Sequence, residues 1–242
     1  MPDSNQISKV ENQIFTNEIK KFILSNGASI VGIGDLTVLN DYKHDPEVPR
    51  GFSRAISMGI RLSDEIINKI TKGPTKAYAE LYRKTNDKLN KIATQTEKQL
   101  EKNGFKTMRI PASQRVNHQK LYGKFPHKTA AILSGLGWIG KSALLISFEH
   151  GPRVRFATIL TNAPLIADKA QETSNCGSCK ICVEACPTEA MTGELWFFGN
   201  PRSKIFNAHA CHKHLKIQEQ RVGETICGIC IAVCPFGKKK QK

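Results

Sequence analysis

The chain has 242 residues, enough to bury a hydrophobic core without help from disulfides. Its 36 Lys and Arg against 21 Asp and Glu give a formal charge of +15, and 40% hydrophobic residues exclude a wholly disordered chain. No segment resembles a signal peptide, and no apolar stretch is long enough to span a bilayer. We therefore expect a cytoplasmic protein that does not bind membranes and whose positive charge favours an anionic partner.

Helical and strand-like patterns alternate over the first two thirds of the sequence. Apolar residues at helical spacing, with stop signals such as Gly27 and Gly104, predict helices over residues 7–23, 75–103 and 127–136. Buried or alternating apolar runs predict strands over residues 28–36, 54–62, 105–110 and 153–161. This order of elements predicts a layered α/β domain.

Two regions are strongly basic. Residues 76–124 contain twelve Lys or Arg against four acids. This density fits either a solvated helix face or an electropositive rim for an anionic substrate or cofactor. Residues 238–242 read Lys-Lys-Lys-Gln-Lys and are expected to be a disordered tail or a nonspecific electrostatic arm.

All eight cysteines fall in the last third of the sequence, and their spacing is specific. The first block reads Cys176-Gly-Ser-Cys179-Lys-Ile-Cys182-Val-Glu-Ala-Cys186-Pro187, and the second reads Cys227-Gly-Ile-Cys230-Ile-Ala-Val-Cys234-Pro235. The first block is the spacing of ferredoxins with two 4Fe–4S clusters, in which the cysteine before proline ligates the other cluster. Cys211, sixteen residues before Cys227, replaces the missing first ligand of the second block.

The crossed ligation of such proteins predicts two complete clusters. The first cluster would be held by Cys176, Cys179, Cys182 and Cys234, and the second by Cys186, Cys211, Cys227 and Cys230. Structural zinc is the alternative, because pairs of cysteines at this spacing also bind zinc, but zinc does not explain the two Cys-Pro endings. Two oxidised clusters with their thiolates would lower the net charge to about +11.

Three histidines flank Cys211 in the sequence, namely His209, His212 and His214. The eight thiols already fill both clusters, so we expect these histidines to lie at the surface or to donate hydrogen bonds to cluster sulfurs.

A glycine-rich segment precedes the cysteines and reads Gly135-Leu-Gly137-Trp138-Ile-Gly140-Lys141. Such glycines let the backbone approach a flat or phosphate-bearing ligand. Residues 135–142 also fit the phosphate-loop pattern Gly-x4-Gly-Lys-Ser/Thr, but a phosphate loop follows a strand, and the residues before this segment favour a helix. No downstream Asp is placed to hold magnesium, so nucleotide hydrolysis is disfavoured.

The glycine-rich segment, the run Phe156-Ala-Thr-Ile-Leu-Thr161 and the cysteine blocks together resemble the epoxyqueuosine reductase family. Members of this family are iron–sulfur and cobalamin enzymes related to reductive dehalogenases. The resemblance covers residues 25–237 and implies an α+β chain with a nitroreductase-like α/β domain that binds base-off cobalamin, followed by a ferredoxin-like domain. We place these domains at residues 1–168 and 169–237, followed by the basic tail at 238–242. The resemblance assigns cobalamin contacts to Gly135, Gly137, Trp138, Gly140 and Lys141.

The implied activity is a reduction in which the nearer cluster reduces cobalt. The family's own reaction removes an epoxide oxygen from a modified tRNA nucleoside, the last step of queuosine biosynthesis. The family's proton-donating Asp has no counterpart here, because residues 121–134 contain no acid and offer only Tyr122, Lys124, His127 and Lys128 as polar groups. We take His127 as the candidate substitute acid.

Two further departures leave the substrate open. Asn162 stands where the family has an Asp after Leu-Thr, and the segment after Cys211 lacks the usual Thr-Glu ending. The sequence also reaches Lys242 without the helical-repeat, tRNA-binding extension of longer members, so we expect a short form.

The sequence is compatible with three functions. The first is an iron–sulfur oxidoreductase that receives electrons from a redox donor protein and acts through cobalamin on tRNA or another anionic substrate. The second is a noncatalytic ferredoxin-type electron-transfer protein that docks a partner enzyme. The third is a tRNA-binding module that keeps only the basic surface.

Overall fold

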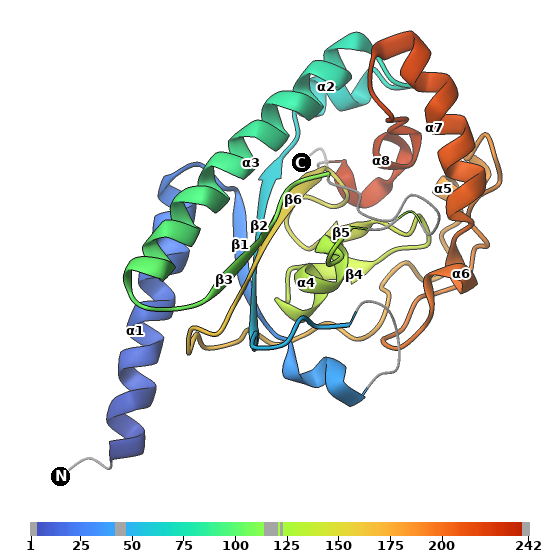
Figure 1. Ribbon diagram of the computed structural model, residues 1–242. Helices are drawn as coiled ribbons and strands as arrows, with labels where there is room; N and C mark the ends of the chain where they lie inside the picture. Colours follow the sequence, from blue (N-terminus) through green and yellow to red (C-terminus); the bar gives the residue numbers. More distant parts are fainter. Residues whose placement is uncertain (1–3, 42–46, 114–120, 122, 239–242) are drawn as a thin grey trace.

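A four-stranded antiparallel sheet forms the centre of the computed structural model, which describes residues 4–41, 47–113, 121 and 123–238 (Figure 1). The strands are β1 (Ile30–Asp35), β2 (Arg54–Arg61), β3 (Thr107–Ile110) and β6 (Val154–Thr161), in the order β1-β2-β6-β3. β2 and β6 pair over their whole length, from Arg54 opposite Thr161 to Arg61 opposite Val154. Both central strands are rich in buried apolar residues, as strands covered on two faces must be.

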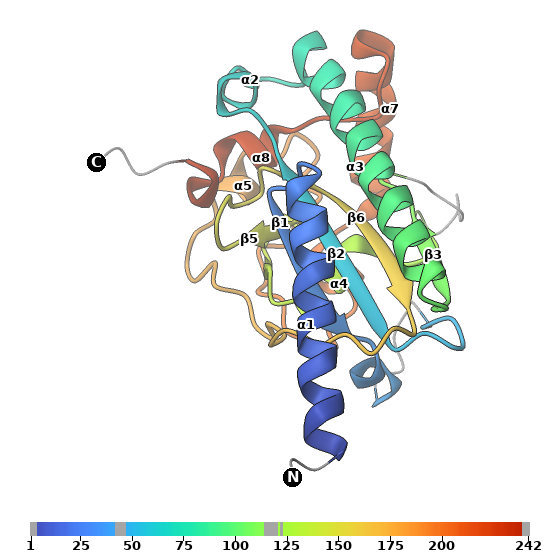
Figure 2. The ribbon, with the colours of Figure 1, turned by 90° about the vertical axis from the view of Figure 1, so that its left-hand side faces the viewer.

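Two long helices, α1 (Ser4–Ser25) and α3 (Lys76–Lys102), cover one face of this sheet (Figure 2). Their apolar stripes, which include Ile23 and Ile92, pack on strand residues such as Ile56. The Thr75 hydroxyl accepts a hydrogen bond from the Tyr78 N–H at 3.1 Å and so caps the first turn of α3. The lysines of α3 are exposed on the outer side of this layer, and Lys84 pairs there with Glu80 at 2.6 Å.

The other face of the sheet carries α4 (His127–Leu133) and a hairpin of β4 (Gly137–Ile139) and β5 (Leu145–Ser147) (Figure 1). The C-terminal part of the chain adds four helices, namely α5 (Ile181–Glu184), α6 (Arg202–Ile205), α7 (Ala208–Val222) and α8 (Ile229–Val233). The short elements are η1 (Thr37–Asp41), α2 (Asp64–Asn68) and η2 (Pro235–Gly237).

The C-terminal part shares a hydrophobic core with the first half of the chain. Ile229 and Ala232 of α8 belong to the same buried cluster as Ile67 of α2 and Tyr78 of α3. Gly228, at the start of α8, has a φ of +87°, and an added Cβ there would lie 2.7 Å from a ring carbon of Tyr78. The division at residue 168 stays a prediction, and residues on its two sides are in close contact.

The predicted α+β organisation is confirmed, with each predicted strand and helix present to within a few residues. The helix expected over residues 127–136 ends at Leu133, because the chain then turns through Gly135, which has a φ of +65°. The β4–β5 hairpin is not among the elements predicted from the sequence. No helix in the part of the chain that the structure describes is long and apolar enough to cross a membrane.

Candidate iron–sulfur site and adjoining cavity

The eight cysteines come from three stretches of the chain that the fold brings together. Cys176 and Cys179 precede α5, which carries Cys182 and is followed by Cys186, while Cys211 lies in the first turns of α7. Cys227, Cys230 and Cys234 lie before, within and directly after α8. α5 and α8 are in contact (Figure 2), and none of the eight cysteines forms a disulfide.

Four of these cysteines form what we call the first thiol set: Cys176, Cys179, Cys182 and Cys234. Burial raises the pKa of Cys182 to about 11, and the thiolates of Cys234, Cys176 and Cys179 act in the same direction. Burial also raises the pKa of Cys234, with further contributions from Cys176 and Cys179. Cys234 therefore faces cysteines that lie about fifty residues earlier in the sequence.

The other four form the second thiol set: Cys186, Cys211, Cys227 and Cys230. Burial raises the pKa of Cys230, and the thiolates of Cys227, Cys211, Cys182 and Cys186 add to this effect. Burial raises the pKa of Cys227. A backbone hydrogen bond from Ile229 opposes this rise, and the thiolate of Cys186 adds to it. The two sets are named after the crossed ligation that the sequence predicts, and this ligation stays a prediction.

A compact site for one metal ion is not preformed. Within the described ranges, no three His, Cys, Asp or Glu side chains converge closely enough to hold a single ion. A tetrahedral zinc site requires its ligands to converge in this way.

The glycine-rich segment lies against the first thiol set. Trp138 of β4 forms a buried contact cluster with Ile146 and Cys234, and Cys176 packs against the same cluster. A Cβ added to Gly140 would lie 3.3 Å from the Cys176 Sγ, so the absence of a side chain lets the hairpin approach this thiol. These contacts favour a role for Trp138 and Gly140 at the first cluster, and their predicted cobalamin contacts remain untested.

The other residues of the segment shape the hairpin. A Cβ on Gly135 would lie 2.5 Å from the Lys169 carbonyl oxygen, and one on Gly137 would lie 2.0 Å from the Ile146 carbonyl oxygen. Lys141 is buried in the turn between β4 and β5. Because the segment forms a strand and a hairpin turn, it lacks the strand–loop–helix geometry of a phosphate loop.

His127 is held by hydrogen bonds from both ring nitrogens. Its Nε2 lies 3.2 Å from the Pro111 carbonyl oxygen and so donates to it, and its Nδ1 lies 2.8 Å from the Thr158 hydroxyl and accepts from it. Burial lowers the pKa of His127 to about 4. This neutral, fully engaged imidazole has no proton directed at a substrate, so the geometry does not favour His127 as the substitute acid. Tyr122, from the same segment, lies outside the described residues.

Lys128 is the more distinctive polar residue of α4. Its Nζ donates to the Ala143 carbonyl oxygen at 2.5 Å. Burial lowers the pKa of Lys128 to about 8, and the nearby Arg202 guanidinium acts in the same direction, whereas the thiolates of Cys211 and Cys230 oppose it. From the sequence Lys128 is only one of several polar groups, because the charged groups near it come from α6, α7 and α8.

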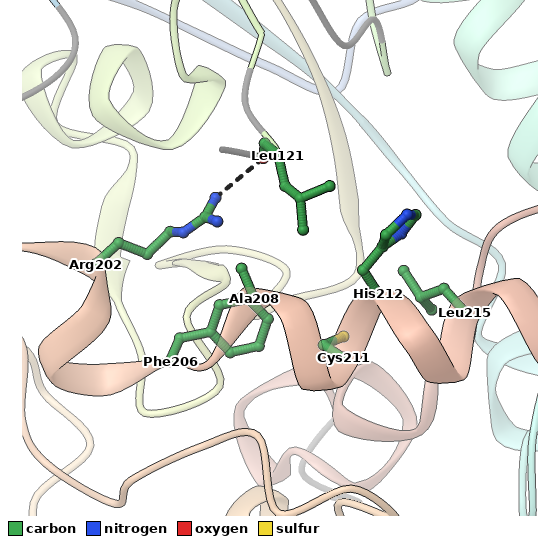
Figure 3. A pocket seen from close by; sticks show the side chains of 7 residues that line it. All are labelled: Leu121, Arg202, Phe206, Ala208, Cys211, His212 and Leu215. Atoms are coloured by element: carbon green, nitrogen blue, oxygen red, sulfur yellow. Dashed lines mark hydrogen bonds between the residues drawn. The ribbon is translucent and has the colours of Figure 1, made fainter. Parts of the chain in front are cut away.

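A small, open cavity of about 90 Å³ adjoins the second thiol set at Cys211 (Figure 3). It is lined by Leu121, Arg202, Phe206, Ala208, Cys211, His212 and Leu215. Arg202 donates a hydrogen bond to the Leu121 carbonyl oxygen at 3.2 Å, and both lie across the cavity from α7, which carries Cys211 and His212. The walls therefore combine a thiol, a cation, an imidazole and apolar side chains.

Residues 175–237 match the family described as 4Fe-4S double cluster binding domain. Among curated relatives, the tetrachloroethene reductive dehalogenase of Sulfurospirillum multivorans is 36% identical over 116 residues, which is 45% of this chain and 23% of that protein. The epoxyqueuosine reductase of Synechocystis is 31% identical over 123 residues, 48% of this chain and 41% of that protein. The chain thus spans less than half the length of these relatives.

Solved structures share the fold over nearly the whole chain. The reductive dehalogenase NpRdhA in complex with 3-bromo-4-hydroxybenzoic acid superposes with a TM-score of 0.68 at 18% identity, over 91% of this chain and 31% of that one. An epoxyqueuosine reductase superposes with a TM-score of 0.63 at 19% identity, over 93% of this chain and 66% of that one. The resemblance predicted from the motifs is therefore confirmed, and the chain combines a fold shared by epoxyqueuosine reductases and reductive dehalogenases with a 4Fe-4S double cluster binding domain.

Proposed function

We propose that this chain is an iron–sulfur reductase that passes electrons through two 4Fe–4S clusters to a cobalamin. The observation that supports the proposal is the arrangement of eight cysteines, none of them in a disulfide, in two adjoining sets, the second of which reaches the wall of a pocket at Cys211. The first thiol set would hold the cluster that receives electrons. The second would hold the cluster beside the cavity.

The residues around the cavity fit one edge of a corrinoid. Phe206 and Leu215 offer apolar contact to a flat ring, and Arg202 offers a cation and hydrogen-bond donors to amide or phosphate groups. A bound corrinoid would supply a strongly reducing cobalt centre. Within the chain, Lys128 keeps a partly buried amine near Cys211 and Cys230, where it offsets negative charge on the second thiol set.

The electron donor in this proposal is an acidic carrier protein that docks beside the first thiol set. Phe148 and Phe236 are 56% and 44% exposed, and their ring centroids lie 5.4 and 5.0 Å from that of Trp138, which contacts Cys234. The exposed Lys238 follows Phe236 closely, and the sequence adds three more lysines by residue 242. An apolar centre beside a basic segment is complementary to an acidic partner.

The substrate class we propose is an anionic molecule, with tRNA as the leading candidate. One solved epoxyqueuosine reductase with this fold is in complex with an epoxyqueuosine-modified tRNA stem loop. In this chain, Arg202 lines the cavity, whereas the basic face of α3 covers the opposite face of the sheet (Figure 1). Arg115 and Lys120 of the basic region lie outside the described residues.

Anaerobic reconstitution with iron and sulfide, followed by titration with cob(II)alamin, tests this function. The expected result is about eight irons per chain and a shift of the corrinoid spectrum to the base-off form at one equivalent. Arg202→Ala should weaken corrinoid binding, whereas Lys84→Ala, on the outer side of α3, should leave it unchanged. Eight irons with no corrinoid spectral change would instead favour the noncatalytic electron-transfer protein.

A further inference from the structure

A buried hydrogen-bond donor of β4 has no acceptor. Trp138 is only 4% exposed, and its indole Nε1 makes no hydrogen bond with any residue the structure describes. Leaving a buried donor unpaired costs about 1–3 kcal/mol, and buried tryptophans usually find a partner for this N–H. The unpaired N–H therefore indicates that a bound group supplies its acceptor.

The surroundings of Trp138 indicate which group this is. Cys234 and Ile146 belong to its buried contact cluster, and Cys176 packs against that cluster. The neighbouring Gly140 approaches the same thiol, because an added Cβ would lie 3.3 Å from the Cys176 Sγ. A cluster held by the first thiol set would place sulfur atoms in this environment, and a sulfur atom can accept the hydrogen bond of the indole N–H.

The rings of Phe148 and Phe236 also lie next to Trp138, with centroid distances of 5.4 and 5.0 Å. The Phe148 ring is tilted by 54° to the indole plane, and the Phe236 ring lies nearly perpendicular to it, at 83°. Carbon atoms of these rings offer no lone pair, and the face of an aromatic ring is only a weak acceptor for an N–H group. A cluster sulfur is the stronger acceptor of the two.

We propose that the Trp138 indole N–H donates a hydrogen bond to a sulfur of the first 4Fe–4S cluster and raises its reduction potential. The inference rests on the proposed function, because it requires a cluster in the first thiol set. A hydrogen bond to sulfur stabilises the extra negative charge of the reduced cluster and so favours reduction. Trp138 is then a positioning and tuning residue for the cluster that faces the donor, and a cobalamin contact is not needed to explain its burial.

A redox titration of the reconstituted protein followed by electron paramagnetic resonance tests this proposal. Trp138→Phe removes the N–H and keeps an aromatic ring, so the equilibrium constant for reducing the first cluster should fall about tenfold, or about 59 mV for one electron. The second cluster should keep its potential. Trp196→Phe is the matched control, because the only other tryptophan is buried in a different core cluster, against Phe198.

Indole ¹⁵N labelling gives a second readout, which detects the hydrogen bond directly and does not depend on the reduction potential. The reduced first cluster should show a hyperfine coupling to ¹⁵N in the wild type and in Trp196→Phe, and this coupling should be lost in Trp138→Phe. An unchanged potential in a fully loaded Trp138→Phe protein, or no coupling in the loaded wild type, would overturn the proposal and leave the N–H facing the Phe236 ring. A wild type that binds no cluster would overturn the proposed function itself, which separates the two failures.

Discussion

Burial raises the pKa of Cys230, and the thiolate of Cys182 raises it further, although the two cysteines belong to different thiol sets. The sets therefore adjoin, with Cys182 on α5 and Cys230 on α8, two helices that are in contact. Clusters held by these sets would lie next to each other, as transfer of electrons from one to the other requires. Each set also draws on both cysteine blocks, so losing one ligand should affect one cluster selectively.

Replacing Cys211 by Ala should remove the second cluster and keep the first. Cys211 is the only member of the second thiol set that α7 supplies, whereas the first set has no ligand on α7. Iron analysis after anaerobic reconstitution should fall from about eight to about four irons per chain. His212→Ala, the neighbouring change on the same helix, should retain about eight irons. Full iron content in Cys211→Ala would contradict the assigned ligand sets.

The stability of the protein should depend on His127 at acidic pH. Burial lowers the pKa of His127 to about 4 in the folded state, against an ordinary value of 6.5. The unfolded chain therefore binds the extra proton first, and stability that is complete above pH 6.5 declines as the pH falls toward 4. At pH 5 the loss amounts to about 2 kcal/mol.

His127→Gln isolates this contribution, because Gln keeps a hydrogen-bonding group but does not titrate. Urea unfolding of both proteins should be measured between pH 7.5 and 5. As the pH falls, the free energy of unfolding of the wild type should decrease more than that of the variant. A difference between the two proteins that does not change with pH would refute a neutral, buried imidazole.

Docking of an electron donor should depend on the exposed aromatic pair next to Trp138. Phe148→Ser and Phe236→Ser remove apolar surface in direct contact with Trp138, so the rate of reduction by an acidic flavodoxin should fall about tenfold for each change. Reduction by dithionite should be unaffected. Ile217→Ser is the control, since Ile217 is 54% exposed on α7, away from this face. The wild-type rate should also fall as salt rises, and a rate insensitive to salt would argue against a basic docking face.

Binding of tRNA, the leading substrate candidate, should be governed by phosphate contacts. The logarithm of the binding constant should then fall linearly as the logarithm of the salt concentration rises. Arg202→Gln should reduce that slope if Arg202 contacts a phosphate at the cavity, whereas Lys98→Gln on the outer side of α3 should leave it unchanged. Affinity measured by filter binding that does not vary with salt would exclude a phosphate-driven contact.

Local patterns were sufficient to predict the four strands of the sheet, and they also predict the two thiol sets as ligands. Alternating apolar residues identified β2 and β6, and the spacing between Cys176 and Cys186 already implied a partner block later in the chain. The surroundings of Trp138 and Lys128 could not be predicted in this way. Trp138 contacts Cys234 only because β4 pairs with β5 and the chain returns to this hairpin. The charged groups near Lys128 lie on elements more than seventy residues later in the sequence. Such contacts depend on tertiary packing, which no local spacing encodes.

The ion pair between the buried Arg153 and the partly exposed Asp64 should hold Cys234, the last ligand of the first thiol set, in place. Arg153 is 1% exposed, and its guanidinium donates to Asp64 at 2.9 Å and to Asn68 at 2.8 Å. Its side chain lies directly under η2, because a Cβ added to Gly237 would lie 2.9 Å from the Arg153 Nε. This segment follows Cys234 immediately, so displacement of Arg153 should disturb that ligand.

Asp64→Ala leaves the buried guanidinium without its carboxylate partner, which typically costs 3–5 kcal/mol for a fully buried pair. Because Asp64 is partly exposed and Asn68 still accepts a hydrogen bond, we expect a loss of about 2 kcal/mol and faster release of iron from the first cluster. Arg153→Met replaces the charge with an apolar chain of similar length and should cost less than Asp64→Ala, since no buried charge is left unpaired. Thermal unfolding and the rate of iron release to a chelator measure both effects, and Lys69→Ala, which breaks only the exposed pair with Glu65, provides the baseline. Equal costs for Asp64→Ala and Lys69→Ala would show that the Arg153 charge needs no partner at this position.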